Sequence, residues 1–298
     1  MNKAEHFKSG FVAVVGRPNV GKSTMINALI GDKIAIVSDK AQTTRNRIIC
    51  VYTDEEKQIV FMDTPGVHKP KHKLGEFMVD AAIESLKETE AVLFVVAGNE
   101  KRGPGDNFII EQLKRVKVPV FLVVNKIDTL QKEQLLEAIV SYQDAYPFAG
   151  VIPISAKNKE NLSELLNVLG EHLPEGPQYF PEDMITDQPE RLIISDIVRE
   201  KILLSTRDEI PHAIAVDVDE MKTRDDGTTY IRATIYCERD SQKGIIIGKK
   251  GALLKQLGAE ARADIQKLLA TKVYLDLWVK VKKDWRNKSG MLSELGYK

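Results

Sequence analysis

The segment 16–23, Gly-Arg-Pro-Asn-Val-Gly-Lys-Ser, constrains the fold of this chain more than any other feature. Residues 11–15 before it are continuously apolar, as in a buried strand, and residues 24–30 after it are apolar at helical spacing. Gly31 then ends the helical pattern. A glycine-containing loop between a strand and a helix is typical of an α/β domain with a mostly parallel sheet and helices on both faces.

The same eight residues match the phosphate-binding pattern G-x-x-x-x-G-K-S. A loop at a helix N-terminus directs backbone N–H groups and a partial positive charge toward one centre. Two glycines allow close approach to a phosphate, the lysine reaches the β- and γ-phosphates, and the serine hydroxyl ligates Mg²⁺. A glycine-containing turn that binds nothing is the alternative, which the flanking strand and helix disfavour. The predicted phosphate loop comprises Gly16, Arg17, Pro18, Asn19, Val20, Gly21, Lys22 and Ser23.

A second motif, Asp63-Thr64-Pro65-Gly66, follows the strand-like run 58–62. A carboxylate at Asp63 is expected to hold Mg²⁺ through its water shell. The turn that follows would bring the N–H of Gly66 to a γ-phosphate. Without the phosphate loop, an ordinary strand-ending turn would be the preferred interpretation.

A third motif, Asn125-Lys126-Ile127-Asp128, follows the apolar run 118–124 and indicates the base. An ionised Asp128 only accepts hydrogen bonds, and guanine offers it two donors where adenine offers neither. Lys126 can lie along the base, and Asn125 can tie this loop to the phosphate loop. A fourth motif, Ser155-Ala156-Lys157, would supply a backbone N–H to the guanine carbonyl oxygen.

The segment 34–47, which is polar and lacks apolar periodicity in 40–45, resembles a nucleotide-sensing switch segment. A hydroxyl there could complete the Mg²⁺ shell, with Thr44 as first choice and Thr43 as second; a solvated loop is the alternative. We therefore predict Ser23, Thr44 and Asp63 as Mg²⁺ ligands, and Lys22, Thr44 and Gly66 as catalytic residues.

The residue directly after the second motif is Val67, which lacks the polar atom of the glutamine that orients water in Ras-like enzymes. The sequence thus predicts slow turnover, or another group that positions water. His68 is the nearest titratable neighbour and is more typical of a surface loop. His68 and His72 lack a third ligand, which disfavours a metal pair.

The proline-rich stretch 177–190 divides the 298 residues into predicted domains at 1–176 and 191–298. The second part shows helical spacing in 190–206, alternation in 212–221, a turn at Asp226-Gly227, and alternation in 230–238. A helical run in 252–269 and an alternating run in 273–281 follow. This order, α-β-β-α-α-β, with a G-x-x-G turn between two helices, is the plan of an α+β type II KH domain.

The turn Gly248-Lys249-Lys250-Gly251 is a candidate clamp for single-stranded RNA, because its glycines permit close approach and its lysines face phosphates. Residues 243–288 hold 12 Lys and Arg against 4 Asp and Glu, a net charge of +8, in a chain whose net charge is zero. A solvated charged face is the alternative. Trp278 and Trp285 could stack on bases or serve in packing.

Together these motifs resemble the Era family of bacterial ribosome-assembly GTPases over essentially the whole chain. The resemblance implies a GTP/GDP switch with Mg²⁺ that binds the 3′ region of 16S rRNA through the KH domain, in rRNA processing and 30S subunit assembly. It implies that a hydrophobic Val67 is normal, that Asn19 can hold K⁺, and that peripheral membrane contact occurs; a monomer is expected. The motifs that carry it lie at 16–23, 42–45, 63–70, 125–128, 155–157 and 245–251.

The chain lacks the apolar core of a signal peptide and any run long enough to span a membrane, so we expect a cytoplasmic protein. Cys50 and Cys237 fall on strands of different predicted domains and are expected to be buried free thiols. Two other functions compete with the RNA-binding switch. One is a GTPase acting mainly at the membrane surface in cell-cycle control, with residues 280–288 on anionic lipid. The other is a metabolic kinase or ATPase, which Asn125–Asp128 disfavours.

Overall fold

A computed structural model describes residues 6–32, 34–38, 43–67, 72–207 and 210–297. The chain forms two compact units, the first made mainly of residues up to Asp187 and the second mainly of residues from Gln188 onward. Among the described residues, no helix is both long and apolar enough to cross a membrane. The motif positions Gln42, His68, Lys69 and Pro70 lie outside the described residues.

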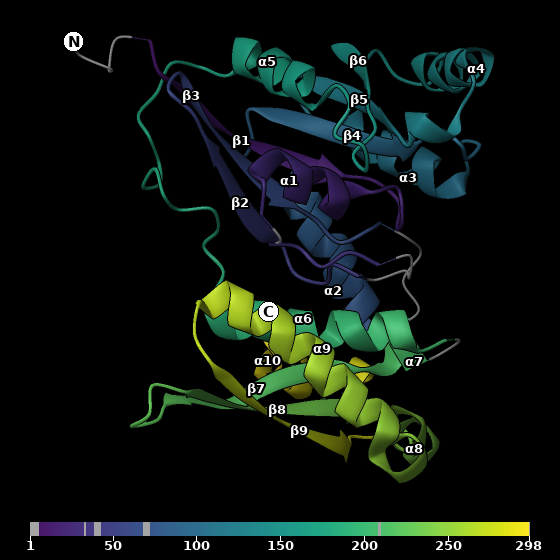
Figure 1. The fold of residues 1–298 in the computed structure, drawn as a ribbon. Coiled ribbons are helices and arrows are strands. Elements are labelled where there is room, and N and C mark those ends of the chain that lie inside the picture. Colours follow the sequence, from purple (N-terminus) through teal and green to yellow (C-terminus); the bar gives the residue numbers. More distant parts are fainter. Residues whose placement is uncertain (1–5, 33, 39–42, 68–71, 208–209, 298) are drawn as a thin grey trace. The chain divides into compact units, whose positions relative to one another are not determined.

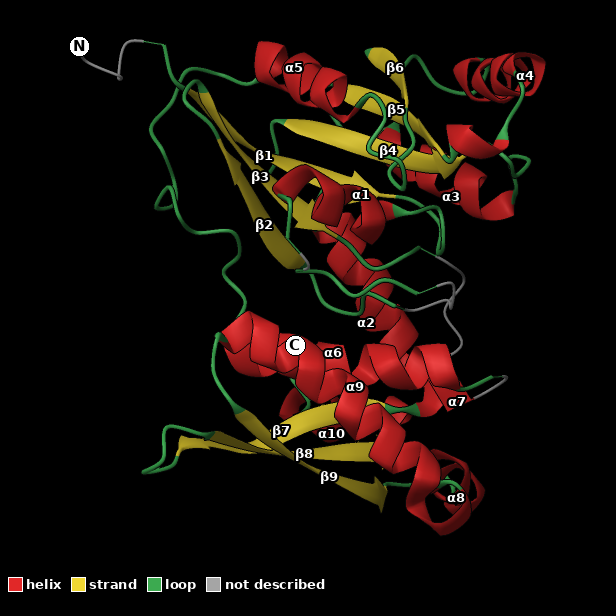
Figure 2. Ribbon diagram, viewed as in Figure 1, coloured by secondary structure: helices red, strands yellow, loops and turns green. Residues whose placement is uncertain are grey.

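The first unit is built on a six-stranded sheet of order β2-β3-β1-β4-β5-β6 (Figures 1 and 2). Only β2 runs antiparallel to its neighbour, which confirms the predicted mostly parallel sheet. Its strands are β1 (Lys8–Val15), β2 (Ile48–Thr53), β3 (Lys57–Asp63), β4 (Ala91–Ala97), β5 (Val120–Asn125) and β6 (Gly150–Pro153). Its helices are α1 (Lys22–Ile30), α2 (Lys73–Glu84), α3 (Pro104–Leu113), α4 (Lys132–Gln143) and α5 (Leu162–His172).

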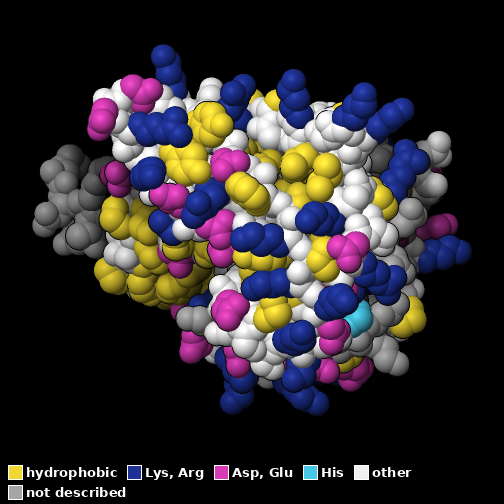
Figure 3. Space-filling model, turned by 90° about the horizontal axis from the view of Figure 1, so that it is seen from below, with side chains coloured by type: hydrophobic (Ala, Val, Ile, Leu, Met, Phe, Trp, Pro, Cys, Tyr) yellow, Lys and Arg dark blue, Asp and Glu magenta, His cyan; other side chains and the backbone are white. Residues whose placement is uncertain are grey.

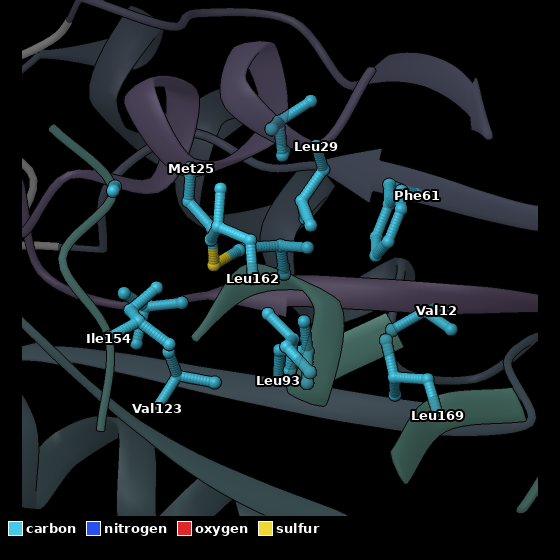
Figure 4. Close-up of a cluster of buried hydrophobic side chains, with 14 of the residues drawn as sticks. Val12, Met25, Leu29, Phe61, Leu93, Val123, Ile154, Leu162 and Leu169 are labelled. Atoms are coloured by element: carbon cyan, nitrogen blue, oxygen red, sulfur yellow. The ribbon is translucent and has the colours of Figure 1, made fainter. Parts of the chain in front are cut away.

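Helices cover both faces of this sheet because its central strands are apolar on both sides. On one face Met25 of α1, Leu169 of α5 and Val12 of β1 belong to one cluster of buried side chains (Figure 4). On the other face α2, α3 and α4 pack against alternate residues of the same strands, such as Ala13 and Phe94. Every residue of β4 is buried, as expected for a central strand.

Part of the predicted linker belongs to the first unit. The N–H of Val51 in edge strand β2 donates to the carbonyl of Ile185, and the hydroxyl of Thr186 donates to the carbonyl of Ile49. The buried side chain of Gln58 accepts from the N–H groups of residues 179 and 180 and donates to the carbonyl of residue 180. The compact unit therefore continues beyond the predicted boundary at 176, to Asp187.

The second unit shows the predicted α-β-β-α-α-β order, with further short helices (Figure 1). Its sheet has the order β7-β8-β9, in which β7 is antiparallel and β9 parallel to β8. The elements are α6 (Glu190–Ser205), α7 (Ile210–Ala213), β7 (Ala215–Thr223), β8 (Thr229–Cys237), α8 (Asp240–Ile247), α9 (Ala252–Leu269), β9 (Val273–Val281) and α10 (Ser289–Glu294).

The start of β7 differs from the sequence-based prediction. Alternation was expected from His212, but residues 210–213 form the short helix α7 and the strand begins at Ala215. Pro211 suits the first turn of a helix, where its missing N–H would have no intrahelical partner. The alternating pattern therefore extended the predicted strand too far.

Both cysteines are buried and unpaired, as predicted. Cys50 lies in β2 and Cys237 in β8, in the sheets of different units. Burial raises the pKa of both thiols, which keeps them protonated and unreactive.

Candidate nucleotide site and nucleic-acid groove

The four motifs of the first unit meet at one edge of its sheet. The phosphate loop joins the end of β1 to α1, Asp63 ends β3, Asn125 ends β5, and residues 155–157 follow β6. These four strands are parallel, so their carboxyl ends lie at the same edge, where open α/β sheets bind ligands.

The phosphate loop has room for glycine alone at two positions. A Cβ on Gly16 would lie 2.3 Å from the carbonyl oxygen of Val95, and one on Gly21 would lie 2.2 Å from Nδ2 of Asn125. Gly21 also has a φ of 98°, in the left-handed region that favours glycine. Asn19 shares this region with a φ of 65°, which curls the loop between the two glycines.

Gly21→Ala is expected to lower the free energy of unfolding by about 2–5 kcal/mol, because left-handed strain adds to the loss of a buried hydrogen bond of Asn125. Gly31→Ala is the matched control, since Gly31 has a similar φ of 89° and no atom within 4 Å of an added Cβ. The control should show only the strain, about 1–2 kcal/mol. Denaturant unfolding measures both variants, and equal losses would contradict the predicted clash.

Lys22 is buried and donates from Nζ to the carbonyl oxygens of Gly16 and Arg17, each at 3.1 Å. Burial lowers the pKa of Lys22 to about 8, and the nearby carboxylate of Asp63 opposes this shift. The cation is thus held at the phosphate loop by neutral acceptors. A nucleotide phosphate would offer it a charged acceptor instead.

The three predicted Mg²⁺ ligands lie together. Oγ of Ser23 lies 3.0 Å from Oδ2 of Asp63 and 3.0 Å from Oγ1 of Thr44, and Oγ1 of Thr44 lies 3.3 Å from the same carboxylate oxygen. Oδ1 of Asp63 is buried without a hydrogen-bond partner, and burial raises the pKa of Asp63 to about 6. Two hydroxyl oxygens beside a carboxylate that lacks a full set of partners fit Mg²⁺, which prefers one or two carboxylates with further oxygens.

Asn125 joins the predicted base site to the phosphate loop. Its Nδ2 donates to the carbonyl of Val20 at 2.9 Å, and its Oδ1 accepts from the N–H of Ala156 at 3.0 Å. Asp128 accepts from Oγ of Ser155 at 2.6 Å, which orients the carboxylate. The N–H of Ala156 thus already donates to Asn125. Among the described residues of this turn, the N–H of Lys157 is left to donate to a guanine carbonyl.

Two acidic residues that no motif indicated hold this site together. Arg17 donates from Nε to the buried Asp106 of α3 at 2.9 Å and from Nη2 to Glu100 at 3.0 Å. The other carboxylate oxygen of Glu100 lies 3.7 Å from Nζ of Lys126. Glu100 therefore bridges the phosphate loop and the predicted base loop. Nothing in the local sequence identified either acid, because each pairs with a residue more than 20 positions away.

The second motif packs against the phosphate loop. The hydroxyl of Thr64 donates to the carbonyl of Val14, and the N–H of Val67 donates to the carbonyl of Gly16 at 3.2 Å. A Cβ on Gly66 would lie 2.8 Å from Pro18, so this close approach also requires glycine. The side chain of Val67 is buried and carries no polar atom, consistent with the expectation that it does not orient water.

A groove of about 440 Å³ lies beside the G-x-x-G turn of the second unit. The turn itself connects α8 to α9, and Lys249 and Lys250 are exposed. Sequence reasoning missed the remaining walls, although their helical spacing along α9 was a usable signal. They are Leu254, Lys255, Gly258, Ala259 and Arg262 of α9, with Tyr274, Leu275 and Leu277 of β9.

The two tryptophans have different surroundings. Trp285 is fully buried, donates from Nε1 to the carbonyl of Ala213 and stacks on Tyr297, so it serves in packing. Trp278 is 54% exposed on β9 and donates to Asp276. Only Trp278 is therefore available to a ligand.

Residues 11–126 match the model of a family described as 50S ribosome-binding GTPase, and residues 209–286 match that of the KH domain. The crystal structure of Era in complex with MgGDPNP and nucleotides 1506-1542 of 16S ribosomal RNA is 43% identical to this chain. Its TM-score is 0.95, and the match covers 98% of this chain and 99% of that chain. The crystal structure of an Aquifex aeolicus Era variant bound to GDP.AlF4⁻ is also 43% identical, with a TM-score of 0.94 and the same coverage.

Proposed function

Because this chain belongs to the Era family of GTPases, we propose that it is a GTP-driven switch that binds the 3′ region of 16S rRNA through residues 209–286. Its GTP hydrolysis is proposed to time rRNA processing and assembly of the 30S subunit. The observation that carries this proposal is the groove at Gly248–Gly251, in a chain that also holds a complete set of nucleotide motifs.

We propose the following nucleotide contacts, which the geometry of the first unit supports. Lys22 and the backbone N–H groups of the phosphate loop bind the β- and γ-phosphates, and the N–H of Gly66 meets the γ-phosphate. Asp128 accepts from the two guanine donors, and the stem of Lys126 lies along the base. The base turn, residues 155–157, donates to the guanine carbonyl. The N–H of Ala156 already donates to Asn125, so the N–H of Lys157 is the proposed donor.

Mg²⁺ would be held by Ser23, Thr44 and Asp63. When bound, it neutralises negative charge on the β- and γ-phosphates. Thr44 lies within the switch segment, so its hydroxyl would couple that segment to the γ-phosphate. Because Val67 is apolar, no glutamine at this position orients the attacking water, which supports slow intrinsic turnover. Asn19 in the phosphate loop is proposed to hold K⁺.

The groove supports the RNA part of the proposal. A G-x-x-G turn clamps about four nucleotides of single-stranded nucleic acid, and the groove walls supply apolar surface for bases. Lys255 and Arg262 line the groove together with Leu254 and Leu277. This combination of cations and apolar walls suits a polyanion with exposed bases.

Two cations proposed for lipid contact in the membrane alternative are paired inside the second unit. Arg286 lies 2.6 Å from Glu238 and Lys282 lies 3.4 Å from Glu294. We therefore favour RNA over an anionic membrane as the partner of this domain. We further propose a cytoplasmic monomer, in keeping with its unpaired cysteines.

Changing Lys249 and Lys250 together to aspartate is expected to weaken binding of single-stranded RNA by roughly 10- to 100-fold, because two phosphate contacts become repulsive. The matched control changes Lys267 and Lys272 to aspartate. Both lysines are exposed in the same unit, so the control changes the net charge by the same amount. Fluorescence anisotropy at fixed salt concentration measures the affinity. Equal RNA affinity in the two double variants would show that the turn is not the RNA clamp.

A further inference from the structure

The face of the second sheet that points away from the helices carries aromatic side chains. Alternate residues of β8, such as Ile231 and Ala233, are buried against the helices, so the residues between them face outward. The register pairs Tyr230 with Tyr274 on this outward face and places Trp278 on the same face, four residues farther along β9. Tyr274 is 53% and Trp278 54% exposed. We call Tyr230, Tyr274 and Trp278 the aromatic platform.

The platform is held in place by its own contacts. The rings of Tyr230 and Tyr274 stack at 5.9 Å with an interplanar angle of 16°. A single carboxylate oxygen of Asp276 accepts from Nε1 of Trp278 at 2.9 Å and from the hydroxyl of Tyr230 at 3.3 Å. The polar ends of two rings are thereby satisfied within the protein. Their orientation is set before any ligand arrives, which lowers the entropy that binding costs.

Cations accompany the platform. The guanidinium of Arg224 lies 4.9 Å from the ring centre of Tyr230 and 5.0 Å from that of Tyr274, and Nζ of Lys222 lies 5.4 Å from Tyr230. Glu220 pairs with Lys222 and Arg232 at this face, whereas the guanidinium of Arg224 lies over the two rings. Figure 3 shows lysine and arginine side chains spread among hydrophobic ones on the face seen from below. Cations beside exposed rings suit a chain of phosphates and unstacked bases.

The platform is continuous with the RNA groove, because Tyr274 belongs to both. Gly258 in the middle of α9 faces Leu277, and β9 begins just after α9 ends. Tyr274 therefore lies at the end of the groove away from the G-x-x-G turn. We propose that an RNA strand leaving the groove at this end continues onto the outward sheet face, where unpaired bases stack on the aromatic platform beside Arg224. This proposal rests on the proposed RNA-binding function of the groove and extends its footprint.

Two RNA probes test the proposal. One has about four nucleotides, the length a KH groove clamps, and the other adds unpaired nucleotides on both sides to about twelve. Trp278→Ala is expected to lower the affinity for the long probe by about 5- to 150-fold, which is the effect of losing one stacked base. The affinity for the short probe should not change. Trp278→Phe should restore most of the affinity. Because Trp285 is buried, the long probe should quench only the fluorescence of Trp278.

Abasic flanking nucleotides provide a second readout. They should weaken wild-type binding of the long probe as Trp278→Ala does, and add no further loss to that variant. Three results would overturn the proposal. They are equal affinity of the wild type for both probes, an equal loss of affinity for both probes in Trp278→Ala, and an undiminished effect of Trp278→Ala when the flanking nucleotides are abasic. If sedimentation instead shows a dimer of the wild type that Trp278→Ala converts to a monomer, this face binds a second copy of the chain rather than RNA. Failure of the groove itself is recognised separately, since Lys249→Asp with Lys250→Asp would then leave the short probe bound.

Discussion

Asp128→Asn is expected to switch the base preference of the nucleotide site from guanine to xanthine and to lower the affinity for GTP by roughly 10²- to 10⁴-fold. The carboxylate accepts from two guanine donors, and each charge-assisted hydrogen bond contributes about 1.5–3 kcal/mol. The asparagine amide would face the base with its carbonyl oxygen as an acceptor and one N–H as a donor, and xanthine has a carbonyl where guanine has an amine. Competition of GTP and XTP against a fluorescent nucleotide measures the exchange.

Two variants sharpen this test. Ser155→Ala removes the hydroxyl that orients the carboxylate at 2.6 Å, so it should weaken GTP without creating a preference for xanthine. Asp144→Asn makes the same chemical change at an exposed position after α4 and should have no effect. Unchanged GTP binding in Asp128→Asn would mean that another group reads the base.

Lys22→Ala is expected to lower kcat/KM for GTP by roughly 10²- to 10³-fold, the cost of one preorganised donor to a reacting phosphate. The fold should survive, because the carbonyl of Gly16 also accepts from the N–H of Val67. The loss should be specific to the phosphates that the ammonium reaches. GTP and GDP affinities should therefore fall, while GMP, which lacks the β- and γ-phosphates, should bind as before.

Lys132→Ala serves as the matched control, since Lys132 is an exposed lysine at the first position of α4. It should leave all three nucleotide affinities unchanged. Calorimetric titration with GMP, GDP and GTP separates the outcomes. A proportional loss of all three nucleotides in Lys22→Ala would indicate a general disturbance of the loop rather than a lost phosphate contact.

The nucleotide site could be predicted from the sequence because it is made of short contiguous motifs at strand ends. Parallel strands bring such ends to one edge, so Ser23 and Asp63 were expected together, and their oxygens lie 3.0 Å apart. Thr44 was the first choice of hydroxyl ligand in the switch segment, and its hydroxyl contacts Ser23 and Asp63. Their roles toward ligands stay predictions.

Other features could not be predicted because they depend on how elements pack. Glu100 meets both Arg17 and Lys126 only because the chain after β4 passes beside two loops. The different surroundings of Trp278 and Trp285 follow from the pleat of β9 and from the docking of the chain after it, which the alternating pattern alone did not distinguish.

Neighbouring residues along the chain encode the phosphate loop at 16–23, the guanine motif, the order of elements in both units and the G-x-x-G turn, so these features could be predicted without the structure. Only the packing of the folded chain brings Asp106 and Glu100 to Arg17 and makes Tyr274 common to the groove and the aromatic platform. The physical reason is that such contacts join residues from different strands and helices. Their distances are set by sheet register and helix packing, to which no short stretch of sequence corresponds.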